Sequence, residues 1–134
     1  MKHLRIILIS LLAILSISAY ARKVPGDKVG AKIDNIVYDF GTVRETEPGV
    51  THEFGITNTG TSALAIIWVK PKCGCTAPEY PRKPIKPGEN AKIKVTFKPA
   101  GQRGEVDKDI RVKLRNGNGK SEELSLRMTG VVIP

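Results

Sequence analysis

Apolar and polar residues alternate at every second position through much of this chain. The clearest example is the segment 92–98, in which Ile93, Val95 and Phe97 alternate with lysines and a threonine. A period of two places one face of a β-strand on a core and the other face in solvent. Gly, Pro, Asn and Asp clusters interrupt the pattern about every ten positions, which is typical of an all-β sandwich.

The pattern predicts about seven strands, with approximate bounds 33–43, 51–58, 63–70, 76–80, 92–98, 110–115 and 124–133. The segment 63–70 is apolar on both parities, so we expect it in the middle of a sheet. The segment 76–80 contains Pro78, which has no N–H to donate and predicts an edge strand. No segment shows helical spacing over two turns. The predicted fold class is all-β, a single immunoglobulin-like β-sandwich of antiparallel strands over residues 33–134.

Residues 1–21 have the pattern of a signal peptide. Lys2 and Arg5 form a positive start, an apolar run covers 6–17, and Ala19 and Ala21 are small residues at the two positions that a signal peptidase recognises. The apolar run is shorter than the roughly 20 residues of a membrane-spanning helix. No cysteine follows it, so a lipoprotein anchor is not expected. We therefore predict a periplasmic or secreted protein of the cell envelope that does not span the membrane after cleavage.

The segment 22–32 contains Pro25, Gly26 and Gly30 and has little apolar content. Such a composition predicts a flexible lead-in to the domain.

Positive charge is the first indication of a partner. The chain has 22 Lys and Arg against 13 Asp and Glu, and without Lys2 and Arg5 the count is 20 against 13, or +7. A basic protein attracts anionic polymers, lipids or nucleic acid. The cations are spread along the chain with no run of five, as on the solvated faces of strands. The signal peptide and the few aromatic residues argue against nucleic acid, so an anionic envelope polymer stays open as a partner.

Six blocks of sequence carry a family resemblance. They are VYDFGTV (37–43), HEF (52–54), TNTG (57–60), CGCTAPEYP (73–81), IKPGE (85–89) and VTFKP (95–99). In this order they closely resemble the exported bacterial family catalogued as domain of unknown function 1573, common in Bacteroidetes-type bacteria, over about residues 33–132. That family is similar to immunoglobulin-like modules of the major-sperm-protein and ASH types. The resemblance implies an exported immunoglobulin-like domain, and it does not imply an activity.

The chemistry of the chain is concentrated in one tetrapeptide. Cys73 and Cys75 are the only two cysteines and are separated by one glycine. In an oxidising compartment such a pair is a disulfide, a metal clamp or a protected redox site. The candidate site is this pair together with the loop that presents it, which includes Gly74, Thr76, Pro78 and Glu79.

The first interpretation is a local disulfide. Residues two apart have Cα atoms roughly 5.5 to 7 Å apart, which overlaps the range that a disulfide permits. Gly74 frees the backbone between the cysteines. Because so short a loop removes little chain entropy, the stabilisation falls well below the usual ~2–4 kcal/mol. A strained, exposed disulfide of this kind is easily reduced.

The second interpretation is a metal site in which Cys73 and Cys75 hold Cu(I), since soft metals prefer sulfur ligands. Zinc needs four ligands, and after signal removal only His52 and Met128 could join the cysteines. Met128 shares its parity with Leu124 and is expected in the core, whereas His52 is expected as a polar residue near the solvent end of its strand. A closed zinc site is therefore not predicted, and Cu(I), or a metal shared between two chains, stays open. No other cofactor is expected.

The third interpretation is thiol–disulfide exchange. The usual redox motif is Cys-x-x-Cys at the start of a helix, where the helix N-terminus lowers a thiol pKa. Here the spacing is shorter and strand-like segments flank the pair, although Lys70 and Lys72 could stabilise a thiolate.

Catalytic machinery is not predicted. Only His52 could serve as a base beside a nucleophile, and no Gly-x-Ser-x-Gly elbow occurs. The carboxylates considered for other chemistry are expected in turns or on outer faces: Glu45, Glu47, Glu53, Glu122 and Glu123. We therefore expect a non-enzymatic binding or assembly module of the bacterial cell envelope, with a protein partner reached through an exposed strand edge. The alternative is a copper or redox carrier that acts through the Cys-Gly-Cys loop.

Overall fold

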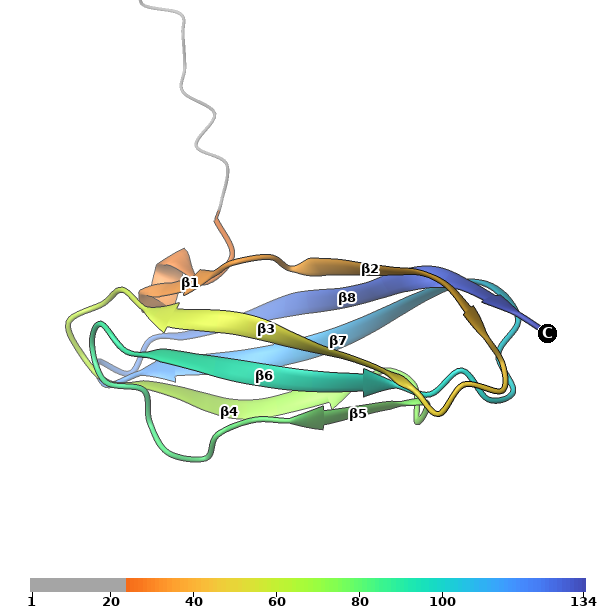
Figure 1. Ribbon diagram of the computed structural model, residues 1–134. Helices are drawn as coiled ribbons and strands as arrows, with labels where there is room; N and C mark the ends of the chain where they lie inside the picture. Colours follow the sequence, from red (N-terminus) through yellow and green to blue (C-terminus); the bar gives the residue numbers. More distant parts are fainter. Residues whose placement is uncertain (1–23) are drawn as a thin grey trace, which may run out of the picture.

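The computed structural model of the protein describes residues 24–134 and consists of two β-sheets packed face to face (Figure 1). One sheet has the strand order β1-β3-β6-β5 and the other the order β2-β8-β7-β4. The elements in chain order are the 3-10 helix η1 (Asp27–Val29) and the strands β1 (Ala31–Ile33), β2 (Val37–Arg44), β3 (Val50–Asn58), β4 (Leu64–Pro71), β5 (Thr76–Glu79), β6 (Asn90–Phe97), β7 (Gly104–Asn116) and β8 (Ser121–Ile133). The predicted all-β sandwich is confirmed.

The predicted signal peptide, residues 1–21, lies outside the described residues. Within residues 24–134, no helix has the length and apolar content needed to cross a bilayer.

The core forms where β6 of one sheet faces β7 and β8 of the other. Side chains at every second position of these three strands are buried, as the alternation predicts: Ile93, Val95, Phe97, Ile110, Val112, Leu114, Leu124, Leu126 and Met128. Full burial of each such side chain contributes about 1.5–3 kcal/mol. The long β7–β8 hairpin, closed by a turn after Asn116, places the two strands side by side along their whole length.

The structure has one strand more than expected, and one of its strand pairs is parallel. The predicted strand 33–43 is two strands, because β1 ends at Ile33 and β2 begins at Val37 in the other sheet. β1 pairs antiparallel to β3, whereas β2 pairs parallel to β8. A period-two pattern of apolar residues does not reveal that the chain passes from one sheet to the other, because both strands have an inward face toward the same core.

The expectation that segment 63–70 is central is wrong, because β4 is the outer strand of its sheet. The register against β7 shifts between Ile66 and Trp68, which marks a β-bulge at Ile67. Leu64 and Ile66 are buried before the bulge and Val69 after it, while Ile67 is 42% exposed. The bulge switches the inward parity, and this switch produces a strand that is apolar on both parities without being central.

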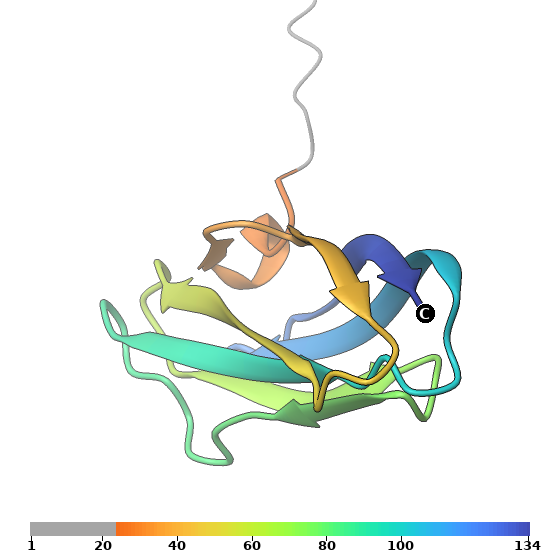
Figure 2. The ribbon, with the colours of Figure 1, turned by 45° about the vertical axis from the view of Figure 1, so that its right-hand side comes forward.

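The prediction of a flexible lead-in at 22–32 is also wrong over the described residues. Val29 and Ala31 are buried, and η1 and β1 lie along one side of the sandwich (Figure 2). The carboxylate of Glu122, 8% exposed on β8, accepts hydrogen bonds from the backbone N–H of Gly26 (3.2 Å) and of Lys28 (3.0 Å). Glu122 was expected on an outer face, and it instead clamps a segment 96 positions away in sequence.

Replacing Glu122 with alanine should release this N-terminal turn. Both backbone donors lose their charged acceptor, so we expect the free energy of unfolding to fall by about 1–3 kcal/mol. Hydrogen exchange, read by mass spectrometry, should be faster at the amides of Gly26 and Lys28. The matched control is Glu123→Ala, whose side chain lies on the outer face; it should leave the exchange of both amides unchanged. Equal exchange in the two variants would show that Glu122 does not hold the turn.

Candidate functional site

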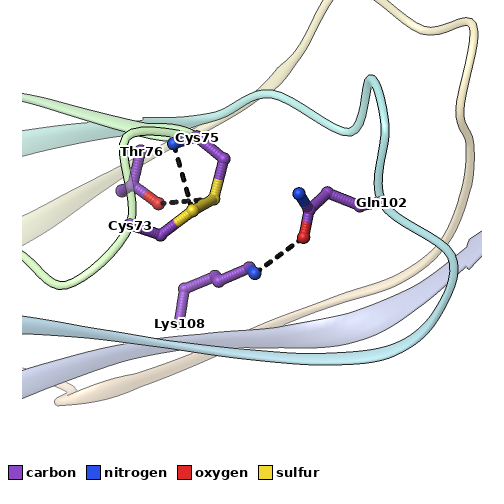
Figure 3. Close-up of a disulfide and its surroundings, with 5 residues drawn as sticks. All are labelled: Cys73, Cys75, Thr76, Gln102 and Lys108. Atoms are coloured by element: carbon purple, nitrogen blue, oxygen red, sulfur yellow. Dashed lines mark hydrogen bonds between the residues drawn. A yellow bond between two sulfur atoms is a disulfide. The ribbon is translucent and has the colours of Figure 1, made fainter.

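The candidate site lies in the turn that carries the chain from β4 in one sheet to β5 in the other. The Cα atoms of Cys73 and Cys75 are 5.2 Å apart and their sulfur atoms are bonded (Figure 3). This separation is slightly below the expected span and within the range of disulfides. The structure therefore agrees with the first of the three interpretations, a local disulfide between Cys73 and Cys75. Copper binding and thiol exchange stay predictions.

Backbone hydrogen bonds fasten the turn to the sandwich. The N–H of Cys75 donates to Sγ of Cys73 (3.1 Å), and the N–H of Thr76 donates to the carbonyl of Cys73 (3.2 Å). The carbonyl of Cys75 accepts from the N–H of Lys98, just beyond β6 (2.8 Å). The turn is thus tied to a strand end that the sequence places more than twenty positions away, which gives the disulfide a defined position.

The two sulfur atoms have different surroundings. Cys75 packs against the hydrophobic core, and the hydroxyl of buried Thr76 lies 3.7 Å from its Sγ. Cys73 instead lines a pocket of about 380 Å³ on the side of the sandwich. Gly74 between them is exposed, and a Cβ built there would meet nothing within 4 Å.

Charged side chains form the rest of that pocket: Lys72, Asp107, Lys108, Asp109 and Arg127. Lys72 pairs with Asp109 at 2.7 Å, and Arg127 pairs with Asp107. The hydrogen bond from Lys72 lowers the pKa of Asp109, and the one from Arg127 lowers the pKa of Asp107. With both carboxylates ionised, two ion pairs line the pocket beside Cys73. Lys108 alternates with Asp107 and Asp109 along β7, and its Nζ lies on the other face of the strand, 5.8 Å from the Phe97 ring centroid.

Lys108 is the cation whose carboxylate partner is missing. Within residues 24–134, no carboxylate lies within ion-pair distance of its Nζ, which donates to Oε1 of Gln102 (2.8 Å). Lys108 lines the same pocket as Cys73, and Figure 3 shows its Nζ directed toward Gln102. Lys70 and Lys72 were the cations expected near the cysteines. Lys108 lies on β7 and only the tertiary fold brings it there, so no local signal in the sequence could have found it.

Pro78 and Glu79 do not take part in the disulfide's surroundings. Both continue into β5, which is the outer strand of its sheet as Pro78 predicts. The carboxylate of Glu79 points to the outer face, 4.0 Å from Nζ of Lys94. Of the predicted loop residues, Gly74 and Thr76 therefore belong to the site.

The two candidate metal ligands beyond the cysteines lie elsewhere. Met128 is fully buried in the core, as expected. His52 lies near the start of β3, as expected, but it is partly buried: its ring stacks on Tyr38 of β2 at 3.8 Å and meets the edge of Phe54 at 4.7 Å. In the part of the chain that the structure describes, no three His, Cys, Asp or Glu side chains are placed to hold a metal together. This finding leaves Cu(I) binding by two thiolates untested.

A second feature adjoins the turn, namely the outer side of β4. Leu64 exchanges backbone hydrogen bonds with Ile85 there, at 2.9 and 2.7 Å. From Ile66 to Pro71, the only strand paired with β4 among the described residues is β7. On the outer face of this edge, Nζ of Lys70 lies 4.9 Å and the guanidinium of Arg111 lies 5.8 Å from the Trp68 ring centroid.

Residues 31–132 match the family described as "Protein of unknown function (DUF1573)". The chain belongs to this family. The match confirms the resemblance found in the sequence blocks, and it begins at β1, in agreement with the ordered N-terminal segment. No curated protein matches this DUF1573 chain in sequence.

Three solved structures have folds similar to that of this DUF1573 chain. The VesB protease of Vibrio cholerae is 16% identical with a TM-score of 0.63, over 76% of this chain and 32% of that one. The ASH/PapD-like domain 7 of human CEP192 is 20% identical with a TM-score of 0.59, over 88% of this chain and 96% of that one. The periplasmic chaperone SfaE is 12% identical with a TM-score of 0.56, over 78% and 60%. At these identities the likeness shows the fold alone.

These structures confirm the predicted similarity to ASH-type modules. The chain spans about a third of the length of the VesB protease. A protease, a chaperone and a human PapD-like domain share the sandwich, so its activity has to be argued from the site.

The stacked histidine yields a prediction of pH dependence. Burial lowers the pKa of His52 from its usual 6.5, partly opposed by the nearby Glu53 carboxylate. Between 6.5 and the lowered value, the unfolded chain binds more protons than the folded chain, so the free energy of unfolding falls as the pH falls through this window. His52→Phe, which keeps an aromatic ring, should reduce this loss between pH 7 and 5. Denaturant unfolding at several pH values measures it, and an identical pH profile in the variant would contradict the assignment.

Proposed function

We propose that this protein is an exported, non-enzymatic binding or assembly module of the bacterial cell envelope that holds an extended segment of a protein partner along β4. One observation carries the proposal: from Ile66 to Pro71, no strand among the described residues is hydrogen-bonded to the outer side of β4. An unpaired edge offers backbone N–H and C=O groups, and an added strand from another chain satisfies them.

The other three sheet edges are poorer docking sites. β1 has three residues, and β5 has four residues including Pro78. β2 is interrupted by a register shift between Asp39 and Thr42, where Gly41 has a φ of 72°. β4 has eight residues and an exposed apolar side chain, Ile67, at its bulge. Native sheets protect their edges with short strands, prolines and bulges. β4 also contains a bulge, but it is one of the two longer outer strands and its bulge exposes an apolar side chain.

The side chains around this edge favour an acidic partner segment. Lys70 and Arg111 flank Trp68, and Arg115 lies opposite Ala65 on the neighbouring strand. Among residues 24–134, neither Lys70 nor Arg115 has a carboxylate within 4.0 Å, so both charges are free to meet a ligand. Trp and Arg are the residues that most often dominate binding energy at protein interfaces. An extended segment that alternates apolar and acidic side chains would complement this edge in shape and in charge.

Export is supported from two sides. Residues 1–21 have the signal-peptide pattern, and SfaE, a periplasmic chaperone, shares the fold. A chaperone among the similar structures is in keeping with a protein partner. A protease is also among the similar structures, so the fold does not decide whether the protein is an enzyme. The absence of catalysis is therefore part of the proposal.

Site-specific photo-crosslinking tests the proposal. A photoreactive phenylalanine at Ile67 should crosslink one protein in intact cells, and the same residue at Lys94, on the outer face of the other sheet, should not. The crosslinked segment, made as a peptide, should protect the amides between Ile66 and Pro71 from hydrogen exchange. Equal crosslinking at both positions, or recovery of polysaccharide alone, would overturn it; the second result would favour the anionic envelope polymer as the partner.

Ile67→Asp should weaken binding of that peptide at least tenfold, or about 1.4 kcal/mol. The variant replaces an apolar contact by a charge that repels the acidic segment, while its exposed position spares the core. Lys94→Asp makes a larger change of charge on the opposite sheet and should leave the affinity unchanged. Titration calorimetry measures the affinity of both variants for the peptide. The unmodified protein, measured at two salt concentrations, should bind the peptide more weakly at the higher salt concentration. If both variants bind like the unmodified protein, the edge of β4 is not the site.

A further inference from the structure

We infer that the Cys73–Cys75 disulfide is an exchangeable one, which oxidises a pair of thiols in another protein, and that Cys73 is the sulfur atom attacked. The inference is independent of the strand-edge function, because it rests on the turn and its pocket alone. Four observations carry it: the different surroundings of the two partly buried cysteines, the exposed glycine between them, the cations of the pocket and the short loop that the disulfide closes.

The unequal surroundings decide which sulfur atom a partner reaches. Cys73 lines the pocket on the side of the sandwich, whereas Cys75 packs against the core. An incoming thiolate has to approach the disulfide along its S–S axis from the side of the attacked sulfur. The pocket provides that space only beside Cys73.

Gly74 keeps the approach open. It is exposed, and a Cβ at this position would meet nothing within 4 Å. Its φ is not among the positive ones of the described glycines, so the backbone does not require glycine there. The absence of a side chain therefore has no structural cause in the turn itself. Glycine leaves the turn without a side chain between the two cysteines.

The cations favour thiolates at this place. Lys72, Lys108 and Arg127 line the pocket with Cys73, against two carboxylates. Lys108, which has no carboxylate partner among the described residues, lines this pocket and directs its Nζ toward Gln102 (Figure 3). The N–H of Cys75, which donates to Sγ of Cys73, would also stabilise a thiolate on that atom. Positive charge and N–H donors lower the pKa of a thiol and promote exchange.

A purely structural disulfide would be of little use here. A loop closed around one intervening residue loses little entropy in the unfolded chain, so its contribution to stability is small compared with that of a long-range disulfide. In addition, both ends of the turn are already held by backbone hydrogen bonds, from the N–H of Lys72 to the carbonyl of Asp109 and from the N–H of Lys98 to the carbonyl of Cys75.

The exchange proceeds in two balanced steps. A thiolate of the partner attacks Sγ of Cys73, which forms a mixed disulfide and breaks the Cys73–Cys75 bond; the electron pair stays on Sγ of Cys75, which takes up a proton. A second thiolate of the partner then attacks the partner's own sulfur in the mixed disulfide and releases Cys73 as a thiolate. The partner has lost two electrons and gained a disulfide, and both cysteines of this protein are reduced.

The first test uses the oxidised protein purified from the periplasm and a soluble peptide with two reduced cysteines. Intact mass spectrometry should show the peptide two hydrogens lighter and the protein two hydrogens heavier. A disulfide that stays intact in excess peptide at equilibrium would overturn the inference. So would an oxidised protein that leaves the peptide unoxidised while its reduced form binds Cu(I) stoichiometrically, since that result identifies a metal carrier.

The second test separates the roles of the two cysteines. In Cys75→Ser only Cys73 is free, and in Cys73→Ser only Cys75 is free; we expect the first variant to react with an aromatic disulfide reagent at least tenfold faster. Circular dichroism verifies that both variants are folded. Equal rates would overturn the assignment of Cys73.

Two further variants test the pocket with the disulfide intact. Gly74→Val should slow reduction by the peptide through steric cover. Lys108→Gln should slow it about threefold through loss of a nearby charge, whereas Lys113→Gln, on the outer face of the same strand, should not. A role confined to folding would leave these rates unchanged, so equal rates in all three variants would overturn the inference.

Discussion

The packing of β6 against β7 and β8 is the interaction on which the rest of this structure depends. The buried side chains of these three strands join the two sheets into one core, and their alternation leaves the opposite faces charged. Because these strands occupy the middle of the sheets, β4 and β5 become outer strands on the same side of the sandwich. The segment that connects them has to cross from one sheet to the other over the exposed side of the core.

This crossing explains the position of the cysteines. A turn between the outer strands of two sheets has one side toward the core and one toward solvent, so neighbouring cysteines acquire different surroundings. Cys75 contacts the core, and Cys73 faces the charged pocket. The open edge of β4 ends at the same turn. Both proposed activities therefore lie on one side of the molecule, and each can be tested without the other.

Two local patterns in the sequence had more than one structural meaning. A strand apolar on both parities can be central, or it can contain a bulge that exchanges its faces, and β4 is the second case. An acidic residue that follows a hairpin turn is usually solvated, but Glu122 shares the inward parity of Leu124 and meets the two N–H groups that need an acceptor. In both cases the partner strand or segment decides between the alternatives.

The sequence by itself determined the all-β class, the inward faces of β6, β7 and β8, the edge position of β5 and the cysteine pair as the candidate site. Each of these follows from short-range physics: the two-residue period of a strand, the missing N–H of Pro78 and the spacing of Cys73 and Cys75. Only the tertiary structure decided that β4 is an outer strand, that the N-terminal turn docks on Glu122 and that Lys108 lines the same pocket as Cys73. These features depend on contacts between residues far apart in the chain, and a local pattern carries no information about which distant group will satisfy a buried charge or cover an edge.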